Sequence, residues 1–321
     1  MASKKDFNEN TRVQVPAAIH LVRLGYTYLS DITEAQYDPW TNILTDVFIR
    51  SFLRLNPELD AQQAQNSLKQ IILACRNDDL GREFYGKLVS ETGVRLVDFN
   101  NPANNEWHVT TEFSCENPDT KDVFRPDITI FANGLPLVFI EVKKPHNHEG
   151  MKAELDRINT RMRNKAFRSF FNITQFMIFS NNEEYLIENR QPRSGAFYAT
   201  ASRTSAFFNA FREQDKDLLS KVKYTPSVPE GTVKQILLHR NCPQLPALPE
   251  FSTNLQPTTP TNRILTSMLS QERLLFLLRY GIAYVEMTKE NKNGDKVTEL
   301  QKHIMRYQQF FATLAIRRTL D

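Results

Sequence analysis

An acid and an amine lie at the end of an apolar strand near the middle of the chain. The segment from Arg125 to Pro145 reads RPDITIFANGLPLVFIEVKKP, in which an Asn-Gly pair separates two apolar runs. This pattern predicts a β-hairpin. Because side chains alternate along a strand, Glu141 and Lys143 share one face of the second strand, while Ile140 lies on the other.

The register of this hairpin decides whether Asp127 joins the pair. A two-residue Asn133-Gly134 turn sets Asp127 opposite Ile140 and leaves Glu141 on the other face. A three-residue loop, Ala132 to Gly134 with the glycine left-handed, sets Asp127 opposite Phe139. Glu141 is then its diagonal neighbour on the same face. We therefore expect the three-residue loop if the trio forms a site.

Two carboxylates and a lysine suit phosphodiester hydrolysis. Mg²⁺ binds one or two carboxylates, keeps several waters and accepts phosphate oxygens as further ligands. It polarises phosphorus and lowers the pKa of an attacking water, while Lys143 would orient that water or neutralise developing charge. The alternative is a solvated surface Asp beside an inert Glu–Lys pair, and the residues alone leave both interpretations open.

A basic stripe follows the hairpin. Between residues 150 and 168 there are six Lys and Arg against two Asp and Glu. On a helix predicted over 149–168, four of them fall in one narrow stripe, namely Arg157, Arg161, Lys165 and Arg168. Aligned basic side chains suit the phosphates of a nucleic-acid backbone. A solvated helix face is the equally open alternative.

The sequence gives less support for zinc binding, nucleophilic catalysis or ATP binding. His146 and His148 have no Cys or further His at ligand spacing, so we expect loop histidines and no zinc site. There is no Ser or Cys nucleophile arrangement, and without a Gly-rich phosphate loop we expect no ATP binding by this segment. Four phenylalanines are expected to pack on a sheet and not to stack on bases: Phe170, Phe171, Phe207 and Phe208.

The elements that must position these residues change type along the chain. Apolar spacing predicts helices near 13–25, 40–52, 61–73 and 81–91. Runs of β-branched and aromatic residues then predict strands over 94–99, 107–115, 127–131, 137–143, 175–180, 184–188 and 196–201. The 149–168 helix interrupts these strands, and a helix over 205–213 follows them. This order predicts an α/β or α+β core.

Prolines concentrate between residues 226 and 260. We therefore expect a first domain over 1–222, a proline-rich linker over 223–262 with a short helix at 232–239, and a helical part over 263–321. Its helices are predicted over 263–286 and 303–320. The chain ends without a helix-stop signal, which we interpret as truncation of a longer protein.

Composition narrows the class of protein. Of 321 residues, 40% are hydrophobic and 24% charged, which is typical of a soluble globular chain. We find no secretory signal and no apolar run long enough to span a bilayer, so we expect no membrane association. Three scattered cysteines suit reduced thiols in the cytoplasm. The net charge is only +3, so nucleic-acid affinity would have to come from local patches.

The hairpin segment resembles the nuclease-domain signature of the restriction (R) subunit of type I restriction enzymes, within the PD-(D/E)xK nuclease superfamily. The resemblance rests on Pro126-Asp127, on Asn-Gly-Leu-Pro in the hairpin and on Glu-Val-Lys-Lys-Pro, in that order and spacing. Near the C-terminus, the run from Arg306 through Gln309 to Ala312 is similar to the Arg-x-x-Gln-x-x-Ala element. In the family that element precedes the Walker A loop of a DNA-translocating motor.

The resemblance implies a restriction-endonuclease-like core, with a central mixed β-sheet flanked by helices. It implies that Asp127 and Glu141 bind Mg²⁺ and that Lys143 is catalytic, giving the sequence-nonspecific DNA cleavage of a type I site-specific deoxyribonuclease. It also implies modification (M) and specificity (S) subunits as partners, with ATP used only by the full-length protein. Residues 263–321 would then be the helical start of a truncated motor.

Two parts of the family pattern are unsettled in this chain. Many members carry Gln-x-x-x-Tyr on the helix after the lysine, which is absent here. Arg157 and Arg161 have the same spacing and could contact DNA phosphate instead. An upstream helix acid often completes such sites, and the candidates are Glu83 and Glu112. The rival hypothesis is a catalytically silent module that binds DNA or docks a methyltransferase complex.

Overall fold

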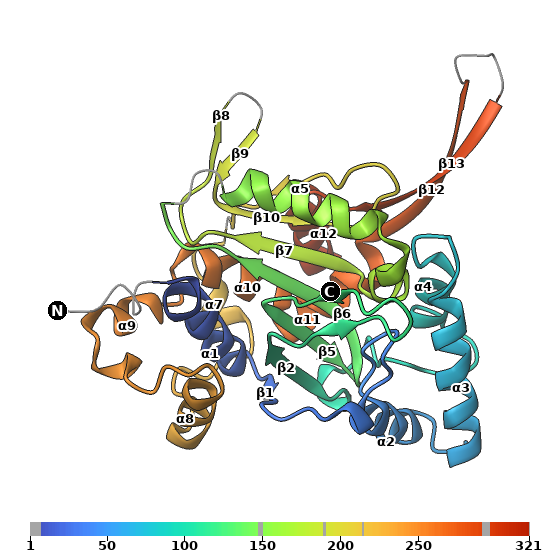
Figure 1. The fold of residues 1–321 in the computed structure, drawn as a ribbon, viewed down its shortest axis with the longest axis horizontal. Helices are drawn as coiled ribbons and strands as arrows, with labels where there is room; N and C mark the ends of the chain where they lie inside the picture. Colours follow the sequence, from blue (N-terminus) through green and yellow to red (C-terminus); the bar gives the residue numbers. More distant parts are fainter. Residues whose placement is uncertain (1–7, 147–149, 189–190, 214, 291–295, 321) are drawn as a thin grey trace.

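A seven-stranded mixed sheet forms the centre of the computed structural model, which describes residues 8–146, 150–188, 191–213, 215–290 and 296–320 (Figure 1). Its strand order is β1-β2-β5-β6-β7-β10-β11. The pairs β1–β2 and β6–β7 are parallel and the other four pairs antiparallel. The strands are β1 Thr27–Tyr28, β2 Trp107–Thr111, β5 Ile128–Ala132, β6 Leu135–Val142, β7 Phe176–Ser180, β10 Ala196–Ala199 and β11 Asn209–Ala210.

Helices cover both faces of this sheet, which confirms the predicted α/β architecture. The face that carries Val138 and Ile140 packs on α1 (Val15–Arg23), α10 (Pro260–Leu269) and α11 (Gln271–Tyr280). The face that carries Phe139 packs on α5 (Gly150–Arg163) and α6 (Arg168–Ile173). Every residue of β5 and β6 is buried, so this hairpin is a rigid platform for whatever lies at its end.

The remaining elements surround this core. The helices are α2 Thr45–Leu55, α3 Ala61–Ala74, α4 Arg82–Leu88, α7 Leu218–Lys221, α8 Glu230–His239, α9 Pro249–Asn254 and α12 Tyr307–Leu320. Three two-stranded sheets pair β3 Cys115–Glu116 with β4 Val123–Phe124, β8 Leu186–Glu188 with β9 Gln191–Ser194, and β12 Ile282–Glu290 with β13 Lys296–Ile304. The β12–β13 hairpin projects away from the body (Figure 1). Within the ranges described, no helix has the length and apolar content needed to cross a membrane.

The β5–β6 turn has two residues, so the predicted three-residue loop is wrong. Asn133 and Gly134 both have positive φ, 51° and 81°, and Ala132 pairs with Leu135. Such a turn requires positive φ at both positions. A Cβ at Gly134 would lie 2.6 Å from the carbonyl oxygen of Leu44, so only glycine fits this approach.

A β-bulge restores the register that the short turn would lose. The pairing shifts between Phe131, which faces Pro136, and Ile130, which faces Val138, so that Leu137 is the extra residue. Ile128 then pairs with Ile140. Continuing this register by one residue sets Asp127 directly across from Glu141. The expectation that the two acids share a face therefore holds, through a bulge and not through a longer loop.

Two predicted elements are absent, and two predicted helices have other bounds. Residues 94–99 form bends and no strand, because side chains satisfy the local backbone: the amide of Asn56 bonds both the N–H and the C=O of Arg95. Residues 205–213 contribute the short strand β11 and no helix. The helix predicted over 263–286 is broken at Ser270, whose ψ is 135°, and ends before β12. The helix predicted over 303–320 begins only at Tyr307, after β13.

The proline-rich region is folded against the first domain. Ile236 and Leu237 of α8 and Phe251 of α9 are buried in the same hydrophobic core as α1, α10 and α11. Pro249 and Pro260 stand in the first turns of α9 and α10, where a missing N–H costs no hydrogen bond. The assignment of 223–262 to a linker and of 263–321 to the start of a motor stays a prediction.

Candidate active site

The end of the β5–β6 hairpin holds Asp127 in place through three hydrogen bonds. Its Oδ2 accepts from the backbone N–H of Val142 at 2.7 Å. Its carbonyl oxygen accepts from Gln14 Nε2 at 2.8 Å and from the N–H of Glu112 at 3.0 Å. The bond from Val142 thus fixes the carboxyl, while those from Gln14 and Glu112 fix the backbone of Asp127.

Lys143 lies at the centre of a cluster of carboxyls. Its Nζ is 3.8 Å from Asp127 Oδ2 and 3.9 Å from Glu141 Oε2, and it donates to the carbonyl of Val142 at 2.7 Å. The side chains of Glu141 and Lys143 are 4% and 10% exposed, which a solvated Glu–Lys pair would not be. The structure therefore brings the three predicted residues together in one buried site.

Two further acids, which the sequence analysis missed, complete this cluster. Glu154 of α5 is 1% exposed and lies 3.4 Å from Lys143 Nζ. Glu9, directly before the π-helical turn Asn10–Gln14, lies 3.5 Å from the same nitrogen. Glu154 is three and seven residues before Arg157 and Arg161, so an acid within the basic stripe was the available signal.

Glu83 and Glu112, the two acids that we considered as completing the site, lie outside the carboxyl cluster around Lys143. Glu83 contacts Asn77 and Lys87, and Glu112 pairs with Arg125 and Arg240. In this structure, Glu9 is the acid from an N-terminal helical segment that reaches the site.

The basic stripe is divided between two places, and the helix predicted over 149–168 is wrong in its second half. Helix α5 ends at Arg163, and Asn164 is extended, with ψ 111°; Glu149 lies outside the described residues. Arg157 binds Glu154 at 2.8 Å. Arg161 reaches Glu141 at 3.5 Å and lies over the Phe124 ring.

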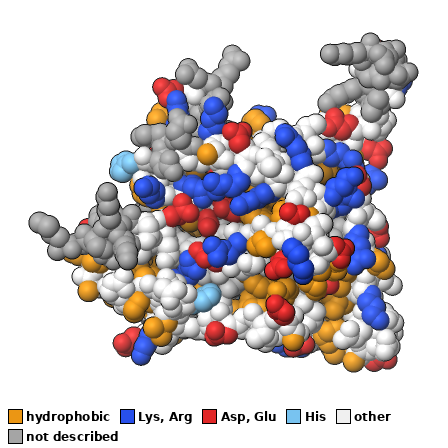
Figure 2. All heavy atoms as spheres, in the orientation of Figure 1, with side chains coloured by type: hydrophobic (Ala, Val, Ile, Leu, Met, Phe, Trp, Pro, Cys, Tyr) orange, Lys and Arg blue, Asp and Glu red, His pale blue; other side chains and the backbone are white. Residues whose placement is uncertain are grey.

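Lys165 and Arg168, the second half of the stripe, lie away from the carboxyl cluster around Lys143. Lys165 lies in a 3₁₀ turn, and Arg168 contacts Asp78 at 3.6 Å. Figure 2 shows basic side chains gathered beside a group of acidic ones near the middle of this face of the molecule.

Burial and mutual repulsion keep the two site acids from ionising easily. Burial, and then the charges of Asp127 and Glu154, raise the pKa of Glu141 well above its usual value. Burial also raises the pKa of Asp127. Both acids are therefore harder to ionise than exposed carboxyls, and a bound cation would favour their ionised forms.

The same acids keep Lys143 charged. Burial by itself would lower the pKa of its ammonium, but the charges of Asp127, Glu154, Glu9 and Glu141 outweigh this effect and raise the pKa. Lys143 is therefore a fixed positive charge at neutral pH.

The donors of the site fit Mg²⁺. They are carboxylate oxygens, the ligands this hard cation prefers, and it needs only one or two of them beside its waters. Within the described ranges no three acidic, His or Cys side chains form a finished metal cage. Oε1 of Glu154 is buried and has no hydrogen-bond partner among the described residues. Asp127 and Glu141, which the hairpin register sets across from each other, are the residues that would hold the ion.

Arg240 links the proline-rich region to residues that adjoin the site acids. Its guanidinium bonds Glu112 and also donates to Asn10 Oδ1 at 2.9 Å, while Asn10 Nδ2 donates to the carbonyl of Arg240 at 3.1 Å. Asn10 follows Glu9, and the N–H of Glu112 holds the backbone of Asp127. One arginine thus contacts the neighbours of two site acids.

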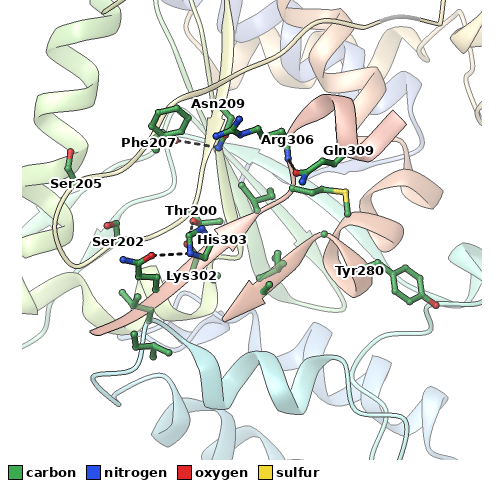
Figure 3. Close-up of a pocket in the computed structure, with 18 of the residues that line it drawn as sticks. Thr200, Ser202, Ser205, Phe207, Asn209, Tyr280, Lys302, His303, Arg306 and Gln309 are labelled. Atoms are coloured by element: carbon green, nitrogen blue, oxygen red, sulfur yellow. Dashed lines mark hydrogen bonds between the residues drawn. The ribbon is translucent and has the colours of Figure 1, made fainter. Parts of the chain in front are cut away.

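The other residues singled out in the sequence lie away from the cluster. His146 is exposed and contacts Glu183, as expected of a loop histidine, and His148 lies outside the described residues. Arg306 and Gln309 line a cavity of about 1010 Å³ (Figure 3). Oε1 of Gln309 accepts from the N–H of Arg306 at 2.8 Å, so this side chain caps α12.

Three of the four phenylalanines pack as predicted, since Phe170, Phe171 and Phe208 are buried. Phe207 does not, because its side chain is 68% exposed and lines the same cavity as Arg306.

Comparison with known proteins gives two matches. A family model described as type I restriction enzyme R protein N terminus matches residues 6–194. The chain is also 28% identical over 200 residues to a protein of Methanocaldococcus jannaschii named "Putative type I restriction enzyme MjaIXP endonuclease subunit". That match covers 55% of this chain and 19% of the relative, so the chain corresponds to about a fifth of the relative's length.

Proposed function

The chain belongs to the family of type I restriction enzyme R protein N termini, and from this premise we propose that it is a Mg²⁺-dependent DNA endonuclease domain. The observation that carries the proposal is the buried convergence of Asp127, Glu141 and Lys143. A bulge after a two-residue turn produces this convergence, and a hairpin without the bulge would separate the two acids.

Each residue has a role that follows from its position. Asp127 and Glu141 hold Mg²⁺, which when bound polarises the scissile phosphate and lowers the pKa of a water. Lys143 is held charged and neutralises the negative charge that builds up on the phosphate oxygens. Arg161 keeps the Glu141 carboxylate in place from the α5 side. No base-reading element takes part, so cleavage is independent of sequence.

Glu154 and Glu9 act on the lysine. Both lie nearer to its Nζ than Asp127 and Glu141 do. Glu154 is enclosed by Arg157, Arg161 and Lys143 and sets the position of the ammonium. Glu9, whose side chain is 36% exposed, lies on the more open side and is the acid placed to meet an entering water or substrate.

The proposal extends to the assembly. The relative is named as an endonuclease subunit, and by analogy this chain works with modification (M) and specificity (S) subunits on DNA. We expect no ATP hydrolysis by this segment, because residues 1–321 contain no Gly-rich phosphate loop.

The first test is calorimetric titration of Mn²⁺ or Mg²⁺ into the wild-type chain, into Asp127→Asn and into Asp156→Asn. Asp156 lies on the exposed side of α5 and is the matched control. We expect saturable binding in the wild type and the control, and at least tenfold weaker binding in Asp127→Asn. Equal binding in all three proteins, or none with DNA present, would favour the silent docking module.

A further inference from the structure

A cluster of basic side chains, separate from the carboxyl cluster, lies beyond the C-terminal end of α5. A cavity of about 260 Å³ opens there between α6, the segment before α4 and the loop after β10. Four basic residues line it: Arg163, Lys165, Arg168 and Arg203. Among the described lining residues Asp78 is the one acid, so the cavity, which we term the basic pocket, carries a clear excess of positive charge.

The basic pocket is built by tertiary contacts and is not a stripe along one helix. Asp78 pairs with Arg168 at 3.6 Å and with Arg203 at 3.2 Å, and the carbonyl oxygen of Asp78 accepts from Arg203. Arg163 donates to the carbonyl of Thr204 at 3.3 Å. Three separate segments thus converge on one small volume, which is the arrangement needed to surround an anion with several donors.

This pocket is separate from the catalytic cluster. Arg163 follows Arg161 by two residues, a rotation of about 200° on a helix. Arg161 therefore faces Glu141 while Arg163 faces the loop after β10. The residues that line the basic pocket do not include Asp127, Glu141 or Lys143.

An exposed aromatic side chain, Phe207, lines a second cavity that adjoins the basic pocket. The pocket shares Leu80 and Ser202 with the larger cavity of about 1010 Å³. In Figure 3, Phe207 lies on one side of this larger cavity, beside Asn209 and Arg306. The remaining lining mixes hydroxyl and amide groups, among them Thr200 and Gln301, with apolar side chains such as Ile282 and with one acid, Glu299.

Phe207 is exposed on an anchored loop. The next residue, Phe208, stacks on Phe179 with ring centroids 4.2 Å apart, and the N–H of Ala206 donates to Asn159 at 2.7 Å. Its neighbours on both sides are thus fixed, so the ring is presented to solvent without a large loss of conformational entropy on binding.

We infer that the basic pocket and Phe207 form a binding site for single-stranded DNA, in which the pocket takes a backbone phosphate and the ring stacks on an unpaired base. Basic grooves beside exposed aromatic side chains are the general means of binding single strands. The bases of a duplex are already stacked on one another and offer Phe207 no free face. The inference rests on the proposed function only in taking DNA as the ligand.

The test measures binding without cleavage. Fluorescence anisotropy of labelled dT12, and of a 12-base-pair duplex, is followed in EDTA with the whole chain. We expect dT12 to bind more tightly than the duplex, and Phe207→Leu to weaken dT12 binding about tenfold, the typical effect of losing one stacked base. Phe207→Trp should retain the affinity, because it keeps a ring.

Two charge variants complete the test. Asp78→Asn removes the carboxylate that competes with phosphate and should tighten dT12 binding, a gain that misfolding does not produce. Arg203→Ala should lower the slope of log K against log salt by about 0.7. Equal affinities of Phe207→Leu and the wild type, or binding of the duplex alone, would overturn the inference. Failure of the proposed function shows instead as absent metal binding, with the dT12 response intact.

Discussion

Lys143 Nζ lies closer to Glu154 Oε2, at 3.4 Å, than to either Asp127 or Glu141, the acids of its own hairpin. The lysine of the proposed nuclease site is thus positioned by helix α5 as well as by the sheet. The helix in turn is held over the sheet by Met151 and Ile158, both fully buried. The site depends on the packing of two layers.

Glu154→Gln should therefore impair catalysis more than DNA binding. The change keeps the shape of the side chain but removes a charge that holds the ammonium and raises its pKa. We expect the rate of plasmid cleavage by the assembled enzyme to fall at least tenfold, with DNA affinity changed less than about threefold. The variant also loses about 1–3 kcal/mol of unfolding free energy, since buried cations lose a charged partner. Asp156→Asn on the same helix is the control.

Lys143→Ala should abolish cleavage and leave DNA binding nearly intact. Removing one preorganised stabilising group costs about 10²–10³ in rate, while the site offers DNA other basic contacts. Lys144 is the matched control, because it is the next residue and is exposed. Cleavage and gel-shift assays on both variants separate the two hypotheses. Loss of DNA binding in Lys143→Ala, with no cleavage by the wild type, would favour the docking module.

Without metal, the contribution of the site acids to the stability of the chain should fall as pH rises. Burial raises the pKa of Glu141 well above 4.5, and raises those of Asp127 and Glu9. At these three acids the folded state therefore binds more protons than the unfolded state, and their contribution to the unfolding free energy falls as pH rises from about 4.5 through the raised values. Urea denaturation in EDTA should show this slope, and Glu141→Gln should flatten it. An identical slope in wild type and variant would contradict the expectation.

Metal should reverse that trend. Mg²⁺ binds the ionised carboxylates and its binding releases protons from these acids, so its affinity rises with pH until Glu141 is ionised. The measurement is the calorimetric affinity at several pH values in two buffers of different ionisation enthalpy, which also reports the number of protons released. Proton release near zero would show that the metal binds elsewhere.

Sequence patterns were sufficient to predict the hairpin that carries the site, but not the bulge or the additional acids that complete it. The apolar hairpin and the alternation of Glu141 and Lys143 are local properties, and they predicted the two central strands and the face that carries the chemistry. The bulge at Leu137 is a tertiary feature, because a two-residue turn and a three-residue loop fit the same letters. The observed turn is held by tertiary contacts, namely the close approach of Gly134 to Leu44 and the bonds from the Asn133 side chain to Leu96 and Asn105.

The missed acids have the same explanation. Glu9 and Glu154 lie 134 and 11 residues from Lys143 in the sequence, and no local pattern links them to it. A stripe predicted from helical period alone also fails once the helix ends, as it does at Asn164. Phe207 was assigned to the core beside Phe208, although adjacent residues in an extended segment point in opposite directions.

Arg240 should couple the proline-rich region to the metal site. It joins Glu112, whose N–H holds Asp127, to Asn10, which follows Glu9. We expect Arg240→Ala to weaken Mn²⁺ binding about three- to tenfold, and a double-mutant cycle with Glu112→Gln to give a coupling of about 0.5–3 kcal/mol in unfolding free energy. Arg279→Ala, which breaks a comparable pair with Glu91 on the far side of the sheet core, should leave Mn²⁺ affinity unchanged. If Arg240→Ala lowered stability while Mn²⁺ affinity stayed at the wild-type value, the arginine would only fasten the strap formed by α8 and α9. A fall in Mn²⁺ affinity would instead make this strap part of the machinery that positions the site acids.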